Sequence, residues 1–87
     1  MARVENMDFT NSEIMPAGSS ADALFELGLM YCAGRDVEQD FIHAHKWFNL
    51  AALRGNAEAK TYRMDLAREM TKRQIAEAQR QAREWLR

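Results

Sequence analysis

From residue 20 onward, apolar residues recur at spacings of three and four, which is the period of an amphipathic α-helix. Four such stripes follow one another along the chain: Leu24, Leu27, Gly28 and Tyr31; Ala44, Trp47, Phe48 and Ala51; Ala59, Tyr62, Leu66 and Met70; and Ile75, Ala78, Ala82, Trp85 and Leu86. No segment has the strict alternation that is typical of a half-buried strand. The pattern therefore predicts an all-α fold of four helices.

Residues that commonly begin or end a helix stand at the borders of these stripes. Residues with capping side chains precede them: Ser19 or Ser20, Asp40, Asn56, and the capping-box sequence TKRQ at 71–74. Gly34 and Gly55 follow the first two helices, where a left-handed residue often ends a helix. Short connections between the helices predict two antiparallel helical hairpins.

Residues 1–19 show no sustained period and end in the breaker cluster MPAGSS. We predict a flexible N-terminal tail here, followed by one helical domain over residues 20–87. The tail also contains several large apolar residues that can order against the domain or against a partner: Val4, Met7, Phe9, Ile14 and Met15.

Composition narrows the class of protein. A chain of 87 residues has room for one small domain, which is of marginal stability unless a partner adds buried surface. The single cysteine, Cys32, cannot form an internal disulfide, as expected in a reducing compartment. Acidic residues occupy the region where a secretory signal needs an apolar run, and no run is long enough to span a membrane. The chain is therefore expected in the cytoplasm, without membrane insertion.

An internal repeat carries the strongest signal. ALFELGLMY begins at Ala23 and AKTYRMDLA begins at Ala59, an offset typical of helix–turn–helix repeats. Over residues 23–59 the chain resembles the Sel-one-like repeat family, a relative of the tetratricopeptide repeat. The positions that carry the resemblance are Leu27, Gly28, Tyr31, Gly34, Val37, Asp40, Ala44, Trp47, Ala51, Ala52, Gly55 and Ala59.

The resemblance covers one full repeat and the degenerate start of a second. Asp36 stands where such repeats commonly have a second glycine, and aspartate tolerates a left-handed backbone better than most residues. Arg63 and Met64 replace the Leu-Gly pair of the second unit, so residues 57–87 are expected to form a capping hairpin. The resemblance implies an α-solenoid fragment that binds proteins without catalysis, often in bacteria as an adaptor or regulator.

The stretch YCAGRDVEQDFIHAH, residues 31–45, contains a thiol, three carboxylates and two imidazoles. His43 and His45 are two residues apart on a predicted helix, so their side chains diverge and cannot chelate from one face. The carboxylates surround a turn, where they commonly bond to backbone N–H groups. Cys32 lies at a helix C-terminus, which disfavours a thiolate. We therefore predict no catalytic residue, no metal site and no cofactor.

Charge is divided unevenly along the chain. Residues 1–53 contain three basic and eight acidic groups, whereas residues 54–87 contain nine basic and five acidic groups. The arginine-rich second half leaves a nucleic-acid-associated regulatory protein as the alternative function. Acidic residues interrupt the basic ones at helical spacing, however, as in the pairs Glu69–Arg73, Glu77–Arg80 and Arg80–Glu84, and this favours solvated helix faces.

The aromatic residues divide into two groups. Tyr31, Trp47, Phe48 and Tyr62 fall in the helical stripes and are expected in the core. The stripes explain Phe25, Met30, Phe41 and Trp85 less well, and these four residues are the candidates for a partner-binding surface. About three repeats are usually needed for a stable stack. We therefore predict an adaptor or accessory subunit that binds a protein partner or copies of itself.

Overall fold

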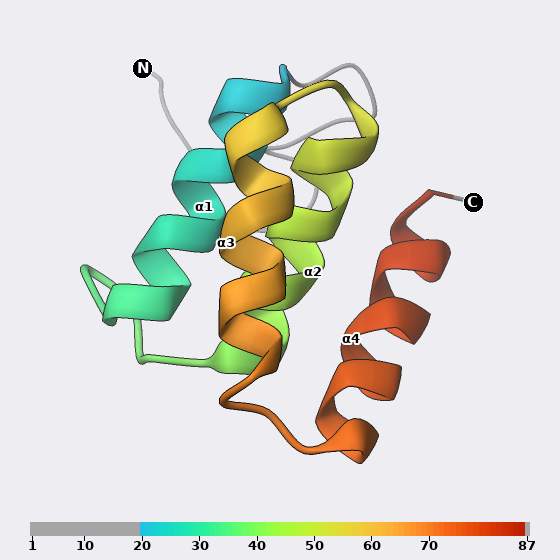
Figure 1. Cartoon of the computed structure of the whole chain (residues 1–87). Helices are drawn as coiled ribbons and strands as arrows, with labels where there is room; N and C mark the ends of the chain where they lie inside the picture. The colour runs from blue at the N-terminus through green and yellow to red at the C-terminus, as the bar shows by residue number, and fades with distance from the viewer. Residues whose placement is uncertain (1–19, 87) are drawn as a thin grey trace.

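The computed structural model describes residues 20–86, which form four α-helices (Figure 1). They are α1 (Ala21–Ala33), α2 (Phe41–Leu53), α3 (Ala57–Ala67) and α4 (Lys72–Trp85), and no strand occurs within residues 20–86. The predicted all-α fold is confirmed. The prediction of a flexible tail concerns residues 1–19, which lie outside the described residues.

Each helix is preceded by a residue whose side chain accepts a hydrogen bond from the backbone N–H three residues later. The acceptor and donor residues are Ser20 and Ala23 (3.1 Å), Asp40 and His43 (3.1 Å), Asn56 and Ala59 (2.9 Å), and Thr71 and Gln74 (3.1 Å). Gln74 Oε1 also accepts the Thr71 N–H at 2.9 Å, which completes the predicted capping box. The helix starts therefore lie where the capping residues predict them.

The turn between α1 and α2 uses two left-handed residues. Gly34, with φ of 73°, ends α1, and its N–H donates to the Met30 carbonyl at 2.8 Å. Asp36 has φ of 65°, so the aspartate keeps the left-handed backbone predicted where related repeats have glycine. The Asp40 N–H donates to the Tyr31 carbonyl at 3.0 Å, and this bond holds the start of α2 against the end of α1.

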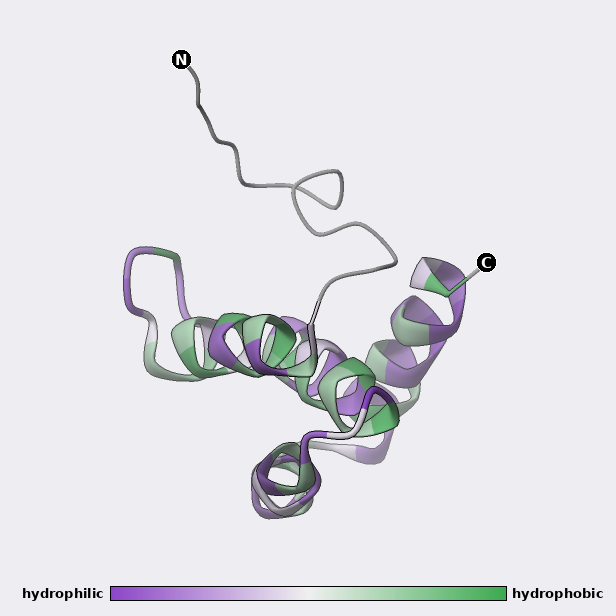
Figure 2. Cartoon of the chain, turned by 90° about the horizontal axis from the view of Figure 1, so that it is seen from above, coloured by the Kyte–Doolittle hydropathy of each residue, from purple (hydrophilic) through white to green (hydrophobic). Residues whose placement is uncertain are grey.

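Helix α2 is the centre of the domain and packs against each of the other three helices. Seen from above, α1, α3 and α4 lie around it (Figure 2). Six of its side chains are buried: Ala44, His45, Trp47, Phe48, Leu50 and Ala51. Against α1, Gly28 lies so close to the Phe48 ring that a Cβ atom there would overlap with it, so the glycine permits the close approach of the two helices.

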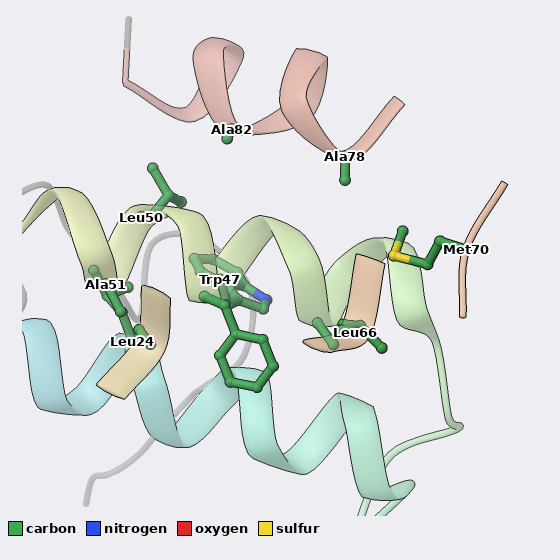
Figure 3. Packing of buried hydrophobic residues seen from close by; sticks show 11 residues of the cluster. Leu24, Trp47, Leu50, Ala51, Leu66, Met70, Ala78 and Ala82 are labelled. Carbon is green, nitrogen blue, oxygen red and sulfur yellow. The ribbon is translucent and has the colours of Figure 1, made fainter. Parts of the chain in front are cut away.

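Small side chains bring α4 close to α2. Ala78 and Ala82 are buried and point from α4 toward α2, while Leu50 points from α2 toward α4 (Figure 3). Helices α3 and α4 each meet the domain mainly through α2. Leu86 was expected in the inner stripe of α4, but it follows the last helical residue and is 49% exposed.

Candidate protein-binding surface

Three aromatic rings from three helices form a cluster that reaches the surface. The Phe25 ring of α1 lies 5.8 Å from that of Phe48 on α2 and 5.2 Å, edge-on, from that of Tyr62 on α3. Phe48 is fully buried, whereas Tyr62 is 44% exposed. The prediction that Tyr62 is a core residue was therefore wrong: its ring covers Phe48 from the outside, and no further helix among residues 20–86 covers Tyr62.

We call the surface made by Phe25 and Leu29 of α1 and Tyr62 of α3 the α1–α3 face. Phe25 and Leu29 are four residues apart, so they share one side of α1, and both are half-buried against the core. Asn56 Nδ2 donates to Asp22 Oδ1 at 3.0 Å and joins the N-terminal ends of the two helices. The face therefore has an apolar centre on two helices that are fixed relative to each other.

Acidic residues border the α1–α3 face on both helices. On α1, Asp22 and Glu26 are exposed, and the helix contains no lysine or arginine. On α3, Glu58 and Asp65 are exposed and fall four residues before and three residues after Tyr62, on the same side of the helix. The apolar centre thus lies between carboxylates.

Two arginines lie beside these acidic borders. Arg35 Nη2 is 3.7 Å from Glu26 Oε1, and Arg68 Nη1 is 3.4 Å from Asp65 Oδ1. All four side chains are more than half exposed, and such pairs contribute little to stability because water screens them. The carboxylates of the face therefore remain accessible to another cation.

Two other arginines, Arg63 of α3 and Arg80 of α4, bond to groups away from the α1–α3 face. Arg63 Nη1 donates to Asn49 Oδ1 of α2 at 2.6 Å, on the side of α3 that packs on α2. Arg80 bonds to Glu77 and, at 2.7 Å, to Glu84. Hydrogen bonds from Arg80 and Gln81 lower the pKa of Glu77 to about 2.

The predicted pairs Glu77–Arg80 and Arg80–Glu84 are therefore formed. Glu69 and Arg73, also predicted to pair, make no ion pair, because Glu69 lies in the turn before α4 and not on the helix itself. Helical spacing brings side chains together only where both residues belong to one helix.

The four predicted partner residues occupy different environments. Phe25 belongs to the three-ring cluster, and Phe41 is partly buried against the core. The Trp85 ring meets the edge of Trp47 at 5.8 Å and lies under the Arg54 guanidinium at 5.4 Å, so it holds α4 on α2. Met30 is half-buried without joining the core cluster. Contacts between helices explain three of these four residues. Such contacts cannot be predicted from the apolar stripe of a single helix.

The histidines occupy contrasting sites on α2. The His43 ring stacks on Tyr31 at 5.0 Å, and its Nδ1 lies 2.7 Å from Asp40 Oδ2. Partial burial raises the pKa of Asp40, but hydrogen bonds from the backbone and ring of His43 outweigh it and lower the pKa. His45 is only 3% exposed, its Nδ1 has no hydrogen-bond partner, and burial together with the charge of Arg63 lowers its pKa.

These polar groups do not form a chemical centre. Cys32 is half-buried, and this burial raises the pKa of its thiol, which disfavours a nucleophilic thiolate. Within residues 20–86, no group of three or more His, Cys, Asp or Glu side chains lies close enough together to hold a metal ion. Asp40 caps α2 and bonds to His43, so both of its oxygens have structural roles.

The paired helices α1 and α2, followed by two further helices that both pack on α2, have the arrangement of a helical repeat of the tetratricopeptide type. Residues 21–56 match the family model described as the Sel1 repeat, so this part of the chain is similar to a Sel1 repeat. Sel1 repeats generally mediate protein–protein interaction and are not catalytic. No curated protein and no solved structure matches the chain. Across the described part of the chain, no helix is both long and apolar enough to cross a membrane.

Proposed function

We propose that this chain is a non-catalytic adaptor or accessory subunit that binds a partner protein in the cytoplasm through the α1–α3 face. The observation that carries the proposal is the exposed Tyr62 ring above the buried Phe48. Aromatic residues that are exposed yet held by packing are typical anchors of protein interfaces, because little side-chain freedom is lost when a partner covers them.

The composition of α1 supports the same conclusion. Only Leu24 and Gly28 of this helix are buried, although most of its residues are apolar. A helix that is apolar on most sides is normally covered on most sides. Helix α4, in contrast, is polar outside its alanine stripe, as expected for the closed end of a repeat stack. The open side of the domain is therefore the side of α1.

A pair of matched variants tests this proposal. Tyr62 and Met64 are both exposed apolar residues of α3, but they are two residues apart, so their side chains diverge by about 200°. Full-length protein with Tyr62→Ala should lose a stoichiometric partner that the unchanged protein and the Met64→Ala variant retain when purified from cells that express it. Retention by Tyr62→Ala, with circular dichroism confirming that both variants fold, would rule out the α1–α3 face.

A further inference from the structure

The charges around the α1–α3 face specify the chemistry of its partner. We infer that the face binds a basic amphipathic segment of another protein, with an apolar anchor on Phe25, Leu29 and Tyr62 and with lysine or arginine residues beside the acidic borders. This inference rests on the function proposed above. It adds the sign of the partner's charge and the place where that charge binds.

The first argument is the arrangement of carboxylates on both sides of one apolar centre. Asp22 and Glu26 line one edge, and Glu58 and Asp65 line the other. Complementary charges at the border of an interface speed association and exclude partners of the wrong sign. An acidic partner would bring its own carboxylates against these four.

The second argument comes from the alternative occupants. A second copy docked through its own α1–α3 face would place Asp22, Glu26, Glu58 and Asp65 against the same four carboxylates. The polar outer side of α4 has the right charge, with Lys72, Arg73 and Arg83 exposed, but it provides few apolar groups to cover Phe25 and Tyr62. Nucleic acid is disfavoured here because its phosphates would approach the acidic borders.

Because the carboxylates are accessible, a cation from a partner protein can replace the arginines that pair with them. Glu26 and Asp65 each have an arginine nearby, at 3.7 and 3.4 Å, in pairs that are well exposed. Water screens such exposed pairs, so a cation from a partner can replace them at small cost. Electrostatic recognition of this kind weakens as salt shortens the screening length, to about 8 Å near physiological ionic strength.

The test uses two synthetic helical peptides with the same leucines spaced three and four residues apart. One peptide has lysines beside the leucines and the other has glutamates, and binding to the full chain is followed by fluorescence anisotropy at low and at physiological ionic strength. We expect the lysine peptide to bind about tenfold more tightly at low salt, a preference that decreases as salt is added.

Two charge-reversal variants test whether the lysine peptide binds at the α1–α3 face. Asp65→Lys and Glu84→Lys change the net charge equally, and each removes one exposed ion pair with an arginine, but only Asp65 borders the face. Asp65→Lys should weaken the lysine peptide about two- to fivefold, the size of one exposed charge pair, while Glu84→Lys leaves its affinity nearly unchanged.

Equal affinity for both peptides, or an equal loss in both variants, would overturn the inference. So would self-association of the chain that Asp65→Lys abolishes and that sedimentation velocity detects without peptide. If Tyr62→Ala loses the native partner while the lysine peptide does not bind, the proposed function stands and only the charge of the partner is wrong.

Discussion

Gly28 of α1 lies directly against the ring of Phe48 of α2, at a distance where a Cβ atom would overlap with the ring. Phe48 cannot move aside easily, because it is fully buried and contacts Phe25 and Tyr62 as well. The contact explains why a glycine occupies the middle of an otherwise apolar helix: it sets the spacing between the first two helices. The same ring supports the exposed Tyr62 from below.

Gly28→Ala should therefore destabilise the protein although alanine is the better helix former. The helix gains about 1 kcal/mol from the substitution, but overpacking in a full core commonly costs about 1–3 kcal/mol. For an overlap this close we expect a net loss of about 1–2 kcal/mol in the free energy of unfolding, measured by urea denaturation. A smaller loss when Phe48→Leu is also present would confirm that the ring is the cause; strictly additive losses would contradict it.

Features that depend on neighbouring residues could be predicted from the sequence. Ser20, Asp40, Asn56 and Thr71 cap their helices as expected, because a capping side chain needs only the backbone three residues away. The left-handed Asp36 follows from the same local logic.

Features that depend on which helices lie next to each other could not be predicted in the same way. The stripe containing Tyr62 shows which side of α3 faces the domain, but not that this side is only partly covered. The stripe of α4 shows that Ala78 and Ala82 face inward, but not that their neighbour is α2. The acidic borders of the α1–α3 face are separated in sequence, and only the joined N-terminal ends of α1 and α3 bring them onto one surface.

Asp36→Gly should stabilise the protein. Aspartate at φ of 65° is in a region that costs most side chains about 1 kcal/mol or more, and glycine occupies it without strain. Glycine also gives the unfolded chain more freedom, so we expect a net gain of about 0.5 kcal/mol in unfolding free energy. Asp36→Ala is the matched control and should lose stability; a gain with alanine would show that the aspartate side chain and not the backbone causes the strain.

Acid should weaken the fold through His45. Burial and the charge of Arg63 lower its pKa in the folded state, so below about 6.5, the unperturbed value, the unfolded chain binds the proton more readily. Stability is therefore full above that pH and decreases as the pH falls toward the lower folded-state pKa, by at most about 1.4 kcal/mol per pH unit for one group.

The His45→Gln variant tests the origin of this dependence. Urea denaturation at several pH values between about 7 and 5, a window above the lowered pKa of Asp40, should show a smaller decrease in stability for the variant than for the unchanged protein. Parallel curves for the two proteins would assign the acid sensitivity to another group.

Ala82→Leu should separate α4 from the domain. Ala82 is 1% exposed and points toward α2, so a larger side chain has no space at this contact. We expect a loss of about 1–3 kcal/mol, concentrated in α4 because the cap of α2 and the contacts of α1 are untouched. Hydrogen exchange should show faster exchange in residues 72–85 than in α1 and α2, and tryptophan fluorescence should change as Trp85 leaves Trp47. Gln79→Leu, on the exposed side of the same helix, provides the control and should leave exchange unchanged; if both variants open α4 equally, helix propensity and not close packing of the alanines holds it in place.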